Sequence, residues 1–189
     1  MMQGDSLPVS VFADRADGTF PQGSSAFEKR GVAVDVPEWL PENCIQCNQC
    51  AYVCPHATIR PFAMDSKEAE AAPAAMKKVP MKGKGCEEYQ FAMTISPLDC
   101  MGCGLCVNVC PAKEKALRMV PQESQAEQQE VFDYAVANVT KKPTSFSDFS
   151  VKGSQFNQPL LEFSGSCAGC AETSYARLIT QLFGERMYI

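Results

Sequence analysis

Short apolar runs recur along the chain in two similar halves. Residues 31–36, 58–62, 90–95 and 116–120 are rich in β-branched, aromatic and other apolar side chains, so each predicts a strand. A loop that contains several cysteines and helical turns separates the first two runs, and a second such loop separates the last two. The order of strand, cysteine loop and strand therefore occurs twice, and this internal repeat predicts a small α+β fold.

Residues 1–30 lack this patterning. Turn-forming strings at Asp17-Gly18 and Pro21-Gln22-Gly23 interrupt short apolar pieces such as 9–12. Too few apolar residues recur at a fixed spacing to form a core of their own. We expect an extended strap lying over a larger body, and a disordered tail is the alternative on composition.

Three further segments are expected to be helical or partly helical. Between the repeats, residues 64–88 form an insertion whose Ala- and charge-rich stretch predicts a surface helix that ends at Pro73. After a Gln- and Glu-rich stretch, the apolar spacing over 131–139 predicts a helix that leads into a loop. A last helix with apolar spacing is expected from about Tyr175 to Phe183.

Composition excludes several classes of function. The formal net charge of −5 and the lack of a basic face argue against a nucleic-acid partner. No apolar stretch reaches the roughly 18 residues that a membrane span needs. The first residues show no basic region followed by an apolar run, so we expect no export signal and a cytoplasmic location.

Candidate chemistry comes from the eleven cysteines, eight of which form two copies of one pattern, Cys-x2-Cys-x2-Cys-x3-Cys-Pro. This is the spacing with which bacterial ferredoxins bind [4Fe–4S] clusters, the fourth cysteine of each run binding the other cluster. We therefore expect two [4Fe–4S] clusters. One is assigned to Cys44, Cys47, Cys50 and Cys110, and the other to Cys100, Cys103, Cys106 and Cys54.

Two other uses of these cysteines are weaker. A disulfide framework requires an oxidising compartment. Zinc needs only four cysteines in two pairs, and would leave the doubled triplets unexplained. Because Gln46 and Asn48 neighbour the first triplet whereas Gly102 and Gly104 neighbour the second, we expect the first cluster to be the more hydrated one.

The other cysteines and the single histidine lie outside the ligand pattern of the two motifs. Cys86 has no triplet around it, so it is expected to be a buried or surface thiol and not a ligand. His56 follows Cys54-Pro55, but each cluster already has four thiolates, so a hydrogen-bonding or packing role is expected. The pair Cys167-x2-Cys170 alone fits a redox dithiol, half of a zinc site or half of a cluster site.

A resemblance to one family spans nearly the whole chain. The chain resembles the pyruvate:ferredoxin (or flavodoxin) oxidoreductases, multidomain enzymes that use thiamine diphosphate. The matching strings are Leu7-Pro8-Val9-Ser10, Ala16-Asp17-Gly18-Thr19, Glu28-Lys29-Arg30-Gly31, Cys44-Ile45-Gln46-Cys47-Asn48-Gln49-Cys50, Val53-Cys54-Pro55-His56-Ala57 and Ser166-Cys167-Ala168-Gly169-Cys170-Ala171-Glu172-Thr173.

The resemblance implies an electron relay. In that family pyruvate is oxidatively decarboxylated to acetyl-CoA and CO2, and electrons leave through a proximal, a medial and a distal [4Fe–4S] cluster to ferredoxin or flavodoxin. Cys167 and Cys170 match the first two proximal ligands, the Cys100 cluster would be medial and the Cys44 cluster distal. Glu172 matches a position in the thiamine-diphosphate-binding domain and receives no role.

The resemblance also implies how the chain is divided. Residues 1–36 match an extended segment, 37–121 a dicluster ferredoxin-like domain with its insertion at about 64–88, 122–163 a linker, and 164–189 the start of the thiamine-diphosphate-binding domain. The remaining proximal ligands and the thiamine and magnesium ligands are not in this chain. We therefore expect part of an oxidoreductase, catalytically incomplete alone, whose full enzyme is a homodimer. A stand-alone dicluster carrier, a relay of another 2-oxoacid oxidoreductase and a zinc-binding structural module remain alternatives.

Overall fold

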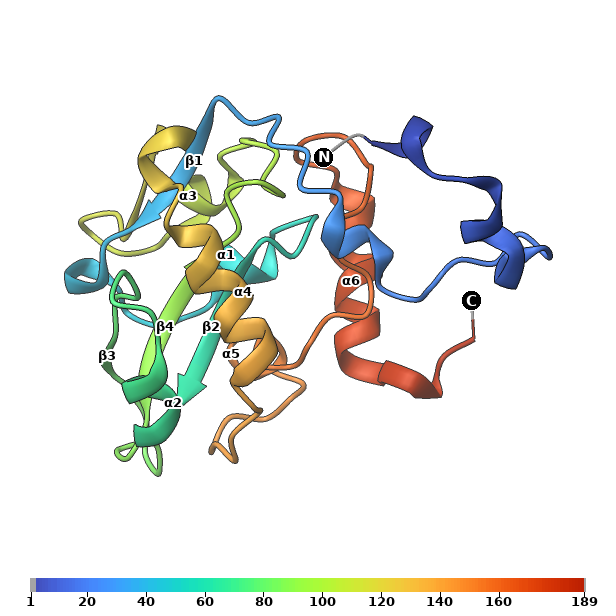
Figure 1. Ribbon diagram of the computed structural model, residues 1–189. Helices are drawn as coiled ribbons and strands as arrows, with labels where there is room; N and C mark the ends of the chain where they lie inside the picture. Colours follow the sequence, from blue (N-terminus) through green and yellow to red (C-terminus); the bar gives the residue numbers. More distant parts are fainter. Residues whose placement is uncertain (1–2, 189) are drawn as a thin grey trace.

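Two small antiparallel sheets organise the protein, whose computed structural model describes residues 3–188 (Figure 1). Strand β1 (Asp35–Trp39) pairs with β5 (Leu117–Pro121), and β4 (Gln90–Ile95) pairs with both β2 (Ile59–Met64) and β3 (Val79–Pro80). Each half of the repeat therefore gives one strand to each of the two sheets. The expected mixture of helices and strands is confirmed.

The strand predictions agree with the structure except at the first strand. The register pairs Val36 with Val120 and Ile59 with Ile95, so the predicted runs meet across the two halves of the chain. The first strand lies at Asp35–Trp39 and not at 31–36. Its partner β5 ends at Pro121, opposite Asp35, so residues 31–34 have no strand to pair with.

Short helices carry the cysteine loops. The helix α1 (Gln49–Tyr52) contains Cys50, and α3 (Leu105–Val109) contains Cys106. The residue before each helix has a left-handed backbone, and so does the residue two positions earlier. These four residues are Gln46 and Asn48 in the first loop, and Gly102 and Gly104 in the second.

The predicted insertion helix and the helix after the second repeat form a second core. Helix α2 (Ser66–Ala71) begins at Asp65, which forms a capping box with Glu68. Helix α4 (Gln128–Asn138) packs on the β2–β4–β3 sheet and buries Val131, Phe132 and Ala135. This part of the segment expected as a linker is therefore packed against the domain and contributes to its core.

The two end segments lie side by side at one edge of the molecule (Figure 1). The C-terminal one contains α5 (Val151–Ser154) and α6 (Ala171–Phe183), which begins four residues earlier than expected. The polar residues Arg177, Thr180 and Gln181 are buried on α6. Apolar residues of α6 are exposed instead, namely Tyr175, Ile179 and Phe183.

The N-terminal segment is extended with short turns of 3₁₀-helix and buries little of its apolar surface, as in Leu7, Val9 and Phe12. The 3₁₀ turns of the chain lie at Gly4–Ser6, Val9–Arg15, Ser24–Phe27, Pro41–Asn43, Gln122–Gln125 and Gly184–Arg186.

Candidate metal centres

The cysteines predicted to hold the first cluster surround one cavity. Its wall contains sulfur-bearing side chains from both halves of the repeat, together with apolar neighbours such as Trp39, Met93 and Leu117. The empty volume is about 340 Å³. The four cysteines in this wall are Cys44, Cys47, Cys50 and Cys110.

A second cavity repeats this arrangement with the halves exchanged. Its empty volume is about 370 Å³, and its apolar lining includes Pro37, Ile59 and Met119. The four cysteines in its wall are Cys54, Cys100, Cys106 and Cys103. In each cavity, three cysteines come from one motif and the fourth comes from the other motif, which is the arrangement that crossed ligation of two clusters requires.

Both a zinc ion and a [4Fe–4S] cluster bind four cysteines. A zinc ion draws four ligands to one point with Zn–S bonds of about 2.3 Å. Within residues 3–188, no three His, Cys, Asp or Glu side chains converge closely enough to hold a single metal ion. All eleven cysteines are free in the structure.

Backbone groups of the cysteine loops also point at the sulfur atoms. The amide of Gln46 donates to Cys44 Sγ at 3.4 Å, and the amide of Gly102 donates to Cys100 Sγ at the same distance. The left-handed backbone at these two positions turns the amides toward the sulfurs. Such donors stabilise the charged form of sulfur and tune the potential of a bound cluster.

Burial acts in the opposite direction on the bare thiols. It raises the pKa of Cys100 to about 11, with the neighbouring Cys54 sulfur adding to the effect. It also raises the pKa of Cys106. These thiols are therefore protonated at neutral pH until a metal displaces their protons, so that binding of metal releases protons.

The third cysteine pair lies beside the second motif. A methyl group placed on Gly169, between Cys167 and Cys170, would lie 3.6 Å from Cys103 Cβ. Gly169 has a φ of +73°, which lets the loop approach this closely. The pair is therefore adjacent to the second cavity, and hydrogen bonds from Thr173 lower the pKa of Cys170.

The expected difference in hydration between the two sites stays a prediction, because the cysteines of the two sets differ in both directions. Cys54, Cys100 and Cys106 are buried but Cys103 is exposed, whereas in the first set Cys44 is buried and Cys47, Cys50 and Cys110 are half-buried.

Cys86 lies in the core as a buried thiol, and His56 lies in a packed, hydrogen-bonded position, as we expected. Cys86 is fully buried in the core beside Phe91 and Met81, and it lines neither cysteine cavity. His56 is buried, and its Nδ1 lies 3.1 Å from the carbonyl oxygen of Ser164. Because a carbonyl only accepts, Nδ1 donates in this contact. His56 Nε2 has no hydrogen-bond partner among residues 3–188.

The Glu28-Lys29-Arg30 string fastens the N-terminal segment to the cysteine-rich domain and to the C-terminal segment. Lys29 Nζ forms an ion pair of 2.8 Å with Asp99, the residue before Cys100. The guanidinium of Arg30 donates to the carbonyl oxygen of Phe163 at 3.0 Å. Both contacts end close to the second cavity or to the loop that leads to Cys167.

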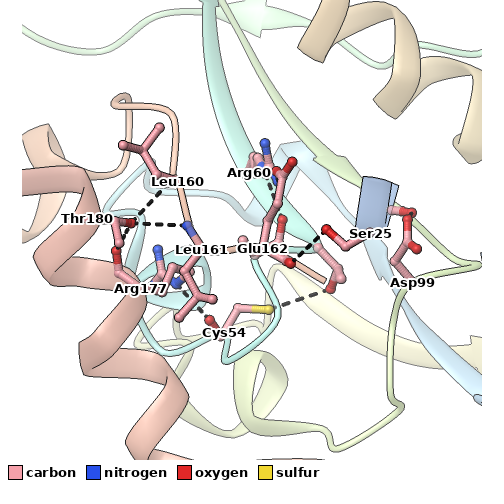
Figure 2. A network of polar contacts seen from close by, with 12 residues as sticks. Ser25, Cys54, Arg60, Asp99, Leu160, Leu161, Glu162, Arg177 and Thr180 are labelled. Atoms are coloured by element: carbon pink, nitrogen blue, oxygen red, sulfur yellow. Dashed lines mark hydrogen bonds and ion pairs between the residues drawn. The ribbon is translucent and has the colours of Figure 1, made fainter. Parts of the chain in front are cut away.

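A second cation from the domain reaches the same segment. Arg60, on β2, forms a buried ion pair with Glu162 (Figure 2). Its guanidinium lies 5.1 Å from the ring centroid of Phe132 and 5.3 Å from that of Phe163. Residues 160–163 are therefore held between β2 and α6, where Thr180 Oγ1 accepts from the amide of Leu160 at 3.0 Å (Figure 2).

Sequence reasoning also missed a second buried cation. Arg177 projects from α6 to the carbonyl oxygen of Cys54, to which its Nε donates at 2.9 Å (Figure 2). Only 1% of Arg177 is exposed. Its position on the polar side of α6 was the available signal, but a polar residue on an amphipathic helix is more often solvated.

None of the helices in residues 3–188 is both long and apolar enough to cross a membrane.

Two family models match this chain, one over the N-terminal segment and one over both cysteine motifs. Residues 1–33 match a family called EKR, a domain of unknown function. Residues 43–114 match the 4Fe-4S dicluster domain, which implies two [4Fe–4S] clusters.

Relatives match over almost the whole chain. The pyruvate-flavodoxin oxidoreductase of Klebsiella pneumoniae is 57% identical over 98% of this chain. The pyruvate:ferredoxin oxidoreductase of Moorella thermoacetica is 51% identical over 100% of it. The mitochondrial pyruvate dehydrogenase [NADP(+)] of Euglena gracilis is 47% identical over 99% of it. The chain spans 16% of the length of the first two relatives and 10% of the third.

Proposed function

We propose that this chain, which is homologous to a segment of the pyruvate:ferredoxin and pyruvate-flavodoxin oxidoreductases, is the electron-relay part of such an enzyme. When bound, a [4Fe–4S] cluster takes up and releases one electron at a time, and closely spaced clusters form a path for electrons. The observation that carries the proposal is the pair of cavities, each walled by three cysteines of one motif and one of the other.

The ligand sets follow from these walls. We assign the first cluster to Cys44, Cys47, Cys50 and Cys110, and the second to Cys100, Cys103, Cys106 and Cys54. The cysteines fix the position of each cluster, the amides of Gln46 and Gly102 donate to sulfur, and the apolar walls exclude water. Cys167 and Cys170 supply two ligands of a third cluster whose remaining ligands come from elsewhere in the enzyme.

The close approach of Gly169 to Cys103 supports the proposed order of the path. The second cluster lies next to the third site, so it is the medial cluster, and the first cluster is the distal one. With clusters bound, electrons would enter at the Cys167 and Cys170 site and leave from the Cys44 side toward ferredoxin or flavodoxin. The direction reverses if the full enzyme runs as a pyruvate synthase.

The activity of the full enzyme is part of this proposal. Oxidative decarboxylation of pyruvate to acetyl-CoA and CO2 uses thiamine diphosphate, and the domain that binds it begins in residues 164–189. Residues 1–36 are the extended segment, 37–121 the dicluster ferredoxin-like domain with its insertion near 64–88, and 122–163 the connection. We further propose that the full enzyme is a cytoplasmic homodimer.

Two measurements test the relay. The 189-residue chain, purified without oxygen, should contain about eight iron and eight sulfide ions, which is two cubes. Zinc in place of iron would overturn the proposal. Combined with the remaining parts of a relative's enzyme, the chain should support pyruvate-dependent reduction of a viologen dye. An equal rate without the chain would show that it is not the relay, and a stand-alone carrier would then be the better description.

A further inference from the structure

The buried guanidinium of Arg177 binds the end of the helix that connects the two cavities. Its Nε donates to the carbonyl oxygen of Cys54 at 2.9 Å, and its Nη2 donates to those of Ala51 at 3.1 Å and Tyr52 at 2.6 Å. These are carbonyls at the C-terminal end of α1, where a positive charge is favoured by the helix dipole. Arg177 therefore contacts the backbone of Cys54, the cysteine of the first motif whose side chain lies in the wall of the second cavity.

The other side of the guanidinium faces two neutral side chains. Nη1 donates to the amide oxygen of Gln155 at 3.1 Å and also to that of Gln181. All three guanidinium nitrogens thus donate hydrogen bonds, but none of the acceptors is charged. Among residues 3–188, Arg177 forms no ion pair with a carboxylate.

A buried charge without a counter-charge is costly. The carboxylate of Glu162 is already paired with a second buried cation, Arg60, so Glu162 does not serve as the counter-charge of Arg177. The guanidinium instead contacts the backbone of Cys54, whose side chain lies in the wall of the second cavity. A negative charge bound in that cavity would therefore lie on the side of Arg177 that contacts Cys54.

The first cavity has a corresponding cation in a different environment. Helix α3 is the counterpart of α1, and Cys110 is the counterpart of Cys54. Lys115 Nζ donates to the carbonyl oxygen of Cys110 at 2.6 Å and to that of Asn108 at 3.2 Å. Lys115 is exposed, whereas Arg177 is buried. Water and salt screen the charge of Lys115 but not that of Arg177.

We propose that Arg177 is the built-in counter-charge of the second cluster and raises its reduction potential, whereas Lys115 has only a weak effect on the first. This inference rests on the proposed function, because it requires that the second cavity holds a cluster. One-electron reduction adds one negative charge to the cluster and moves no proton. A fixed positive charge in a medium of low dielectric constant therefore favours the reduced form.

The proposal also gives α6 a function in the relay. Arg177 lies seven residues after Cys170, on the helix that begins at this proposed ligand of the third cluster. Docking of α6 therefore brings the third site and the charge that tunes the second cluster into place together. Ser174, on the same helix, donates to the carbonyl oxygen of Val53 at 3.1 Å and supports this docking.

Redox titration of the loaded 189-residue chain, followed by electron paramagnetic resonance, tests the proposal. In Arg177→Met, the ratio of reduced to oxidised second cluster at a fixed potential should fall at least tenfold, which is about 59 mV for one electron. In the matched control Lys115→Met, the ratio for the first cluster should fall less than threefold. Variants Cys54→Ala and Cys110→Ala, each lacking one crossing ligand, assign the two signals.

A second variant changes the charge beside Arg177 without removing the guanidinium. Gln155→Glu places a carboxylate of the same size beside the guanidinium and neutralises its charge, while Arg177 stays in place. This variant should lower the ratio for the second cluster in the same direction as Arg177→Met, and Arg177→Lys should retain most of the wild-type ratio.

The outcomes separate the two proposals. If Gln155→Glu leaves the ratio for the second cluster within twofold of the wild type, Arg177 is not the counter-charge. An equal shift of both clusters in Arg177→Met would also overturn the proposal, since it would indicate a general structural change. Wild-type chain that binds no iron–sulfur cluster would instead refute the proposed function.

Discussion

Two glycines in the second cysteine loop provide a matched pair for a quantitative test. Gly102 and Gly104 have φ angles of +67° and +72°, so a side chain at either position costs about 1–2 kcal/mol of backbone strain. A methyl group at Gly104 would meet nothing within 4 Å. At Gly102 it would lie 3.0 Å from the carbonyl oxygen of Asp35 and 3.2 Å from Ala33 Cβ.

The two alanine variants should therefore differ by the cost of the contact. Overpacking of this kind adds about 1–3 kcal/mol, so Gly102→Ala should lose about 2–5 kcal/mol and Gly104→Ala about 1–2 kcal/mol. Because 1.36 kcal/mol is tenfold in rate, a typical difference of about 2 kcal/mol predicts a roughly 30-fold faster loss of cluster from Gly102→Ala.

Release of iron to a chelator, followed by the decay of visible absorbance without oxygen, measures these rates. Gly104→Asn is the control, because Asn48 occupies the equivalent left-handed position in the first loop with φ +62°. It should be the mildest of the three variants. Equal rates for Gly102→Ala and Gly104→Ala, or a reversed order, would refute the packing argument.

Three substitutions test the packing around the sites by chemical or thermal unfolding. Glu162→Ala leaves Arg60 buried and unpaired, so it should cost about 3–5 kcal/mol. Glu28→Ala removes the half-exposed partner of Arg30 and should cost less than about 1 kcal/mol of stability. If Glu162→Ala and Glu28→Ala lost equal stability, burial would not be what makes the Arg60 ion pair important. Phe91→Ala empties a fully buried position and should cost about 3–5 kcal/mol; a loss below 1 kcal/mol would mean that this core is not tightly packed.

The sequence predicts those parts of the fold that depend on local patterns. The cysteine spacing is a local property, and it assigned the same four cysteines to each set that the two cavity walls contain, although the ligation itself awaits test. The strands at 90–95 and 116–120 were also predictable, because β-branched and apolar residues cluster there. The first strand lies later in the chain than predicted, because its limits depend on where β5 ends.

The parts that could not be predicted depend on contacts between distant segments. Arg177 is 123 residues from Cys54, whose carbonyl it binds, and Lys29 is 70 residues from Asp99. Neither partner can be inferred from spacing along the chain.

The central claim is that the fourth cysteine of each motif completes the cluster of the other motif. The most direct measurement is the iron content and the electron paramagnetic resonance spectrum of Cys54→Ala, prepared without oxygen beside Cys86→Ala, which changes a buried cysteine that lines neither cavity. Cys86→Ala should keep about eight irons. Cys54→Ala should lose the cube bound by Cys100, Cys103 and Cys106 and keep the one bound by Cys44, Cys47 and Cys50. Loss of the Cys44 cube instead, or retention of both intact cubes, would contradict crossed ligation.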